Sequence, residues 1–351
     1  MGMLTIHHGM AACRSPALWT RVVARFTAIV ALAILATPFA AGAQPAGKVY
    51  RIGCVWPATR DTATPYVKVL HSALNDLGYV VGVNIVVEHR FGDYPDRLPG
   101  YVEEFARSKV DAILAVTNPV IAVAKRATTT IPIVMLYAFN PIGAGLVQSL
   151  ARPGGNVTGV AFDAAPETYS KHLELLKAVS PTASRIGVVR SAEFYLDAPG
   201  MEPYLRAVSD AAHRLDLKLR FFDVRTPRDV EDAFRQVPRS GIQAMYVMPD
   251  PMTFSNAARI AAWAAQSRLP SVFAYRDHVE AGGLLSYGAN IREMPRQAAV
   301  YLDRLFKGAR PADLPIEQPT KFELVINLKT AKTLGLTFPQ SLLGRADHII
   351  E

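Results

Sequence analysis

Two stretches of the sequence decide the fold because they repeat one pattern: DRLPGYVEEFARSKVDAILAVTNP (residues 96–119) and RDVEDAFRQVPRSGIQAMYVMPDP (residues 228–251). Each predicts a helix, a short break, an apolar strand, and then a polar residue before proline. Asn118-Pro119 and Asp250-Pro251 are therefore equivalent. Further pairs follow in the same order, namely Arg51-Ile52-Gly53 with Arg185-Ile186-Gly187, Tyr137 with Tyr275, and Gly154-Gly155 with Gly282-Gly283. The order of these pairs indicates an internal duplication.

Short runs rich in Val and Ile alternate with amphipathic segments along the whole duplicated region. Runs of this kind without strict alternation are typical of parallel strands buried on both faces. We therefore predict an α/β protein with two similar doubly wound parallel-sheet lobes joined by a multi-strand hinge. The expected strands cover residues 50–56, 84–90, 112–116, 133–137, 157–162, 185–189, 218–224, 244–248, 271–274, 284–287 and 322–326.

The N-terminal segment has the features of a secretory signal peptide. Arg14, Arg21 and Arg25 precede an apolar run of about 15 residues, and Ala41-Gly42-Ala43 forms a small-x-small site before Gln44. The run is short of the roughly 20 residues that span a bilayer. We expect residues 1–43 to be removed by cleavage after Ala43, and the mature protein to lie in the periplasm.

The charge of the chain bears on whether it binds nucleic acid, and its cysteine content bears on whether it forms a disulfide. The net charge of +8 falls to +5 when the three arginines of the leader are removed, and the remaining basic residues are dispersed. Nucleic acid is therefore not an expected partner. Cys13 lies in the leader, which leaves Cys54 in an apolar strand without a second cysteine to pair with. We expect Cys54 to be a core residue.

Ligands of open parallel α/β sheets bind outside the carboxyl ends of the strands, so residues just after the predicted strands are candidate ligand contacts. Asn118 and Asp250 either cap the helices that follow or face a ligand, with Thr117 and the helix N-terminus suited to an anion. The aromatic candidates either pack in the core or sandwich an apolar ligand. The full set is Trp56, Thr59, Thr117, Asn118, Tyr137, Asn140, Phe162, Tyr195, Asp250, Tyr275 and Tyr287.

Motifs of catalysis are missing from the sequence. It contains no G-x-x-x-x-G-K-[ST], no H-E-x-x-H and no G-x-S-x-G. The six histidines after the leader do not pair at metal-ligand spacing. We expect no catalytic residues, no metal and no cofactor.

The segments ARPGGNVTG (residues 151–159) and EQPTKFELVINLKTAKTLGL (residues 317–336), together with IPIVMLYAFNPIGAGLVQSL (residues 131–150), resemble those of a known family. They are similar to ABC-transporter substrate-binding proteins of the tryptophan/tyrosine-type group, which have the type I periplasmic binding fold. The resemblance implies a monomeric periplasmic receptor that closes on a small molecule, such as an amino acid or an aromatic acid, and delivers it to an ABC permease in the inner membrane.

The type I fold implies three crossings between the lobes, expected near Phe162-Asp163, Ser286-Tyr287 and Pro311–Pro315. Lobe one would comprise residues 44–162 and 287–312, and lobe two residues 163–286 and 316–351. Two other functions remain open at this point. One is a periplasmic sensor that uses the same cleft to signal to a membrane partner, and the other is a two-lobed enzyme whose reactive groups are distant in sequence.

Overall fold

Two sheets with the same strand order account for the duplicated sequence. The computed structural model describes residues 48–92, 97–162, 165–237 and 240–351. The predicted leader, residues 1–43, lies outside them. The first sheet has the order β2-β1-β3-β4-β5, and all its neighbouring strands are parallel. Its strands are β1 (Tyr50–Trp56), β2 (Ile85–Phe91), β3 (Ala112–Val116), β4 (Ile133–Ala138) and β5 (Val157–Ala161).

The second sheet repeats this order as β7-β6-β8-β9-β10 and then extends it. Strand β11 pairs antiparallel with β10, and β12 pairs parallel with β11 at the edge. The strands are β6 (Arg185–Ser191), β7 (Lys218–Val224), β8 (Ala244–Val247), β9 (Ser271–Phe273), β10 (Leu285–Ala289), β11 (Phe322–Asn327) and β12 (His348–Ile350). The two-lobed α/β prediction is confirmed.

Helices cover both sheets, as parallel strands require. Three helices connect successive strands of the first sheet, namely α2 (Arg60–Asp76), α3 (Leu98–Arg107) and α4 (Thr117–Ala127). The helices α5 (Pro166–Val179), α6 (Glu202–Arg214), α7 (Pro227–Gln236), α8 (Pro251–Ser255), α9 (Ala257–Gln266) and α10 (Arg276–Glu280) belong to the second half. After β11 come α12 (Leu328–Leu334) and α13 (Gln340–Leu343). None of the helices in the described residues has the length and apolar character that crossing a membrane requires.

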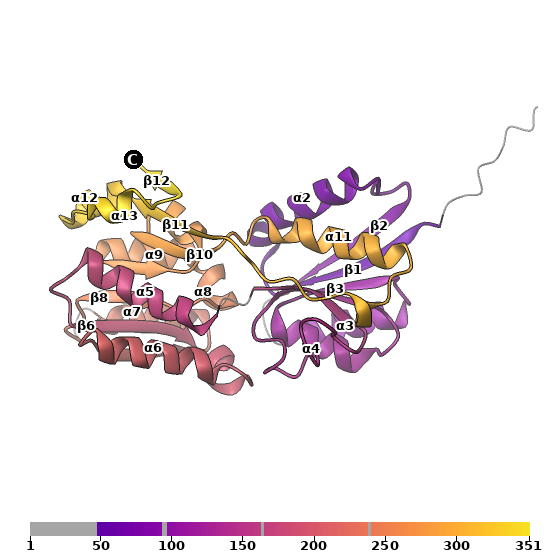
Figure 1. Ribbon diagram of the computed structural model, residues 1–351, viewed down its shortest axis with the longest axis horizontal. Helices are drawn as coiled ribbons and strands as arrows, with labels where there is room; N and C mark the ends of the chain where they lie inside the picture. Colours follow the sequence, from indigo (N-terminus) through magenta and orange to yellow (C-terminus); the bar gives the residue numbers. More distant parts are fainter. Residues whose placement is uncertain (1–47, 93–96, 163–164, 238–239) are drawn as a thin grey trace, which may run out of the picture. The chain divides into compact units, whose positions relative to one another are not determined.

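One helix from late in the sequence packs with the first sheet. Helix α11 (Met294–Phe306) lies beside α2, as Figure 1 shows, and also contacts β4 and β5. The chain enters this region after Ala289, because β10 pairs with β11 as far as Ala289 and Phe322. The second crossing therefore lies a few residues later than Ser286-Tyr287.

The third crossing is also later than expected. The short 3-10 helix η3 (Pro311–Asp313) contacts β5, and the backbone N–H of Glu317 donates to the carbonyl oxygen of Gly159 at 3.1 Å. The chain therefore leaves the first sheet after Glu317 and enters β11 at Phe322. The first crossing was expected at Phe162-Asp163, and residues 163–164 lie outside the described residues.

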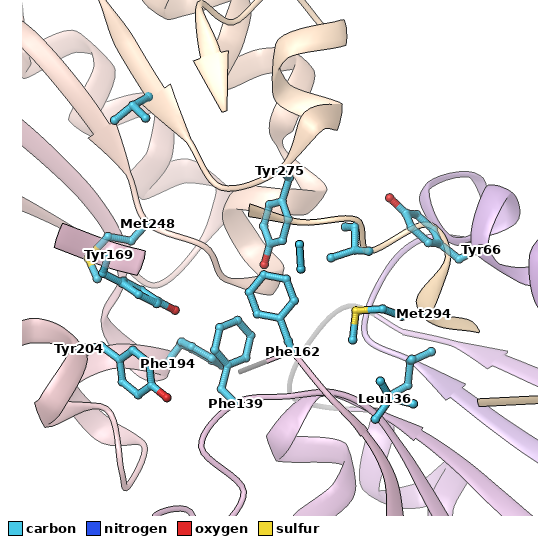
Figure 2. Packing of buried hydrophobic residues seen from close by; sticks show 14 of the residues in the cluster. Tyr66, Leu136, Phe139, Phe162, Tyr169, Phe194, Tyr204, Met248, Tyr275 and Met294 are labelled. Atoms are coloured by element: carbon cyan, nitrogen blue, oxygen red, sulfur yellow. The ribbon is translucent and has the colours of Figure 1, made fainter. Parts of the chain in front are cut away.

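Most of the buried side chains among the described residues from 49 to 351 are apolar. Cys54 is fully buried in β1, as expected of a core residue, and burial raises the pKa of its thiol. The largest core cluster includes residues of both sheets and the aromatic side chains that Figure 2 shows. Four of these rings, Tyr66, Phe139, Phe162 and Tyr275, also line a cavity.

Candidate functional site

An apolar cavity lies where carboxyl ends of strands from the first sheet meet helices of the second half. It contains about 570 Å³ of empty space, part of which is open to solvent. The lining includes no charged side chain. Its residues are Trp56, Pro57, Ala58, Ala63, Tyr66, Val116, Thr117, Tyr137, Phe139, Phe162, Pro251, Phe254, Tyr275 and Ile291.

Five of the eleven predicted site residues line this cavity: Trp56, Thr117, Tyr137, Phe162 and Tyr275. Phe162 links the two halves, with ring centroids 4.6 Å from Phe139 and 5.6 Å from Tyr275 (Figure 2). Burial raises the pKa values of Tyr137 and Tyr275 well above the ordinary tyrosine value, so both hydroxyls stay protonated. The cavity therefore presents aromatic faces and neutral hydroxyl groups.

Thr117 is the unusual polar residue of the lining. Its backbone has φ of 69°, a left-handed conformation that a β-branched residue adopts only under strain. The side chain is only 7% exposed, and its Oγ1 is buried without a hydrogen-bond partner among the described residues. Thr117 is also the first residue of α4, a helix that no side chain caps. An unused hydroxyl thus lies beside the N–H groups that a helix leaves free at its start.

Asn118, the next residue, supports the cavity wall and does not line it. Its amide nitrogen donates to the carbonyl oxygen of Phe139 at 2.7 Å, and its amide oxygen accepts from the N–H of Phe139 at 2.8 Å. The two bonds hold the backbone after β4, so that the Phe139 ring packs against Phe162. Asn118 therefore positions a residue that the sequence analysis missed.

Asp250 has a structural role in place of the predicted ligand contact. It is fully buried, and Oδ1 accepts from the N–H of Thr253 at 2.8 Å while Oδ2 accepts from the N–H of Ser191 at 3.1 Å. The side chain of Thr253 bonds back to the N–H of Asp250, which completes a capping box at the start of α8. Burial raises the pKa of this carboxyl group to about 6. The capping alternative is the one that the structure supports.

The other four predicted residues also lie outside the lining. Thr59 caps α2, where its Oγ1 accepts from the N–H of Thr62 at 3.3 Å. The amide nitrogen of Asn140 donates to the carbonyl oxygen of Gly200 at 2.7 Å, a bond between the two halves. The buried Tyr195 donates its hydroxyl to the carbonyl oxygen of Pro249 at 2.6 Å. The backbone oxygen of Tyr287 bonds to a ring nitrogen of His172 at 2.6 Å, and its ring stacks on that of Phe322.

Helices supply lining residues that a list of strand ends does not contain. Tyr66 of α2 and Phe254 of α8 meet edge to face with ring centroids 5.7 Å apart. The Tyr66 hydroxyl donates to Oδ1 of Asp277 on α10 at 3.1 Å, and Arg292 donates to the same oxygen at 2.7 Å. Tyr66 was detectable as an aromatic residue in the second turn of the helix after β1. The contact with Asp277 has no signal in the sequence, because the residues are 211 positions apart.

Known proteins share the fold and the sequence pattern. A tyrosine-binding protein of Clostridioides difficile (strain R20291) is 27% identical over 267 residues, which cover 75% of this chain and 74% of that protein. The crystal structure of a conserved domain protein from Vibrio cholerae is 25% identical and has a TM-score of 0.78, covering 86% of this chain and 100% of that one. An ABC domain from Streptococcus pneumonia in complex with L-Trp is 24% identical with a TM-score of 0.77, covering 86% and 99%.

The family comparison covers nearly the whole described chain. The model of the ABC transporter substrate binding protein family matches residues 52–350. The members of this family bind solutes and are not enzymes, which agrees with the prediction of no catalytic residues and removes the two-lobed enzyme from consideration. The resemblance found in the sequence is confirmed. The chain belongs to the family of ABC transporter substrate binding proteins.

Proposed function

We propose that this chain is the periplasmic solute-binding component of an ABC importer, and that it captures a small molecule with an aromatic body and a carboxylate. The observation that carries the proposal is the unused hydroxyl of Thr117 in a cavity otherwise walled by aromatic and aliphatic side chains. A buried polar group without a partner costs about 1–3 kcal/mol, so a ligand that bonds to it recovers that energy. A carboxylate suits this position because it accepts from the hydroxyl and from the start of α4.

The apolar part of the ligand follows from the walls. Trp56, Tyr66, Phe162, Phe254 and Tyr275 surround the space with ring faces and edges, which favour a flat aromatic group. The related proteins named above bind tyrosine or are described with L-Trp, which supports the same chemistry. L-tyrosine and L-tryptophan are therefore the first ligands to test.

Capture requires the lobes to move apart and then close, as in other two-lobed receptors. We infer that the bonds from Tyr66 to Asp277 and from Asn140 to Gly200 form as the lobes close, because each joins the first half of the chain to the second. We further propose that the chain acts as a monomer, is exported by its leader, and presents its closed form to a permease in the inner membrane.

A thermal-shift panel tests the ligand class. The compounds are L-tyrosine, L-tryptophan, an aromatic acid without an amino group, tyramine without a carboxylate, and L-isoleucine without a ring. A ligand at 100 times its Kd stabilises the folded state by about 2.7 kcal/mol, which raises Tm by several degrees. Compounds with both a ring and a carboxylate should raise Tm, and tyramine and L-isoleucine should not. Stabilisation by tyramine alone, or by no compound, would refute the proposed ligand class.

Two cellular measurements test the remaining parts of the proposal. The mass of the protein recovered from the periplasm should match a chain that begins at Gln44. Uptake of the radiolabelled ligand should fall to background when this chain is deleted and recover when it is restored. Unchanged uptake would contradict the importer and favour a receptor that signals.

A further inference from the structure

Three hydrogen-bonded side chains lead from the cavity wall toward the surface. The indole nitrogen Nε1 of Trp56 lies 3.0 Å from Nδ1 of His89, and Nε2 of His89 lies 2.9 Å from Nε2 of His71. The Trp56 ring is 2% exposed and lines the cavity, whereas His71 on α2 is half-buried. The ligand therefore meets the ring of Trp56, while His89 occupies its only donor.

These contacts leave His89 with a single arrangement of protons. An indole N–H is a donor only, so Nδ1 of His89 must accept and cannot carry a proton. The proton of neutral His89 is then on Nε2, where it is donated to Nε2 of His71. His71 in turn must carry its own proton on Nδ1. Each ring thus has one tautomer that satisfies all three groups.

We propose that His89, with His71 behind it, is the residue that positions the Trp56 ring in the cavity wall, so that protonation of His89 releases the ring and weakens ligand binding. The proposal rests on the function proposed above. A protonated His89 would place a second proton on Nδ1, directly facing the N–H of Trp56. Two donors cannot share that contact, so the indole must move or turn, and the wall that it forms is lost.

The surroundings of His89 keep it neutral near neutral pH. Burial lowers its pKa to about 4, and the nearby His71 and Arg60 act in the same direction. Arg60 lies at the start of α2 with its guanidinium 4.7 Å from the centre of the Phe91 ring, which itself stacks beside His89. The groups beside His89 include Cys54, its register partner on β1, and Trp56 from the same strand. Arg60 and His71 come from α2, and Phe91 from the strand of His89. None of these groups is a carboxylate. A protonated His89 would therefore lie near the cationic Arg60 without an acidic partner among them.

Fluorescence of the ligand-free protein tests the positioning directly. Trp19 lies in the leader, so Trp263→Phe in the mature protein leaves Trp56 as the single indole. We expect its emission to change as the pH is lowered from about 7.5 to about 4, because the indole loses its acceptor and faces a cation. His89→Asn is the matched control: its amide oxygen replaces Nδ1 as acceptor and does not titrate. A transition that persists in His89→Asn, or no transition with His89 present, would overturn the proposal.

Binding of L-tyrosine over the same pH range tests the consequence. The carboxylate and ammonium of L-tyrosine keep their charges there, so a change reflects the protein. We expect Kd to rise on the order of tenfold toward pH 4, the loss of about one hydrogen bond, and to stay flat in His89→Asn. His71→Gln keeps a neutral acceptor for Nε2 of His89 and leaves Nδ1 free to titrate, so it should retain the rise. A rise in Kd that persists in His89→Asn would refute the coupling. If L-tyrosine fails to bind at any pH, the proposed ligand is wrong, and the fluorescence transition still decides how Trp56 is held.

Discussion

The junctions β3–α4 and β8–α8 occupy the same place in the two halves of the duplicated fold, yet they use their polar residues differently. Helix α4 begins at Thr117, directly after the last residue of β3, whereas Met248, Pro249 and Asp250 separate β8 from α8. The longer connection lets Asp250 adopt extended backbone, with φ of −152°, and cap its helix. No residue separates β3 from α4. The backbone of Thr117 is left-handed there, and its hydroxyl has no partner among the described residues.

This difference assigns unlike tasks to the two lobes. The first contributes an unsatisfied hydroxyl and an uncapped helix start, which are suited to the polar end of a ligand. In the second, Asp250 accepts from the backbone N–H of Ser191, and Tyr195 donates to the carbonyl oxygen of Pro249. This lobe contributes the rings of Phe254 and Tyr275 to the cavity. We infer that the ligand is anchored on lobe one and covered by lobe two.

The largest expected effect concerns the polar core of lobe two in acid. Burial lowers the pKa values of His172 and His278 to about 4, below the unfolded value of 6.5. Their neutral forms stabilise the fold fully above pH 6.5, and this contribution is lost as the pH falls toward 4, by roughly 3 kcal/mol for each histidine. Urea unfolding between pH 7 and 4 should show the decline.

Asp250 has the opposite effect on the pH dependence of stability, so its contribution can be distinguished from that of the histidines. Its raised pKa means that its contribution is greatest in acid and is lost as the pH rises through about 6. His172→Gln keeps a donor for the carbonyl of Tyr287 and an acceptor for the hydroxyl of Tyr246, and it should remove part of the decline. A decline that is unchanged in His172→Gln would show that other groups cause it.

The second prediction concerns the cap. Asp250→Ala should lower the free energy of unfolding by about 2 kcal/mol, because the N–H groups of Ser191 and Thr253 lose their acceptor. Asp250→Asn keeps one acceptor and should cost less. The ligand affinity of the folded Asp250→Ala protein, measured by calorimetry, should change little. A stable variant that no longer binds would return Asp250 to the ligand site.

The third prediction concerns the anchor in lobe one. Thr117→Val should weaken ligand binding by about ten- to thirtyfold, the loss of one hydrogen bond to a charged group, without lowering the free energy of unfolding. The stability should hold because Oγ1 of Thr117 has no partner within the described chain. Thr117→Ser keeps the hydroxyl and should retain most of the affinity. Loss of stability in Thr117→Val with unchanged affinity would place the hydroxyl outside the ligand site.

The contrast between the lobes also shows what the sequence could and could not predict. Repeated turn residues and apolar runs predicted two parallel-sheet lobes and the strands of both sheets except β12, since buried parallel strands have a distinctive composition. The sequence analysis paired Asn118 with Asp250, but neither residue lines the cavity. Which side chain faces the cavity depends on where the helix after the strand begins. Helix α4 follows β3 directly, whereas three residues separate β8 from α8. Tyr66 and Phe254 were missed because their place depends on how the helices pack across the lobes.

The smallest expected effect concerns the contact that joins the lobes beside the cavity. Tyr66→Phe keeps the ring in the wall and removes only the hydroxyl that donates to Asp277. We expect about fivefold weaker ligand binding through faster dissociation, with the association rate unchanged, because this bond forms after the ligand has entered. Stopped-flow kinetics measures both rates, and Tyr287→Phe, whose ring lies outside the lining, is the control. A slower association with unchanged dissociation would mean that Tyr66 guides the ligand in, and that the lobes are not held closed through Asp277.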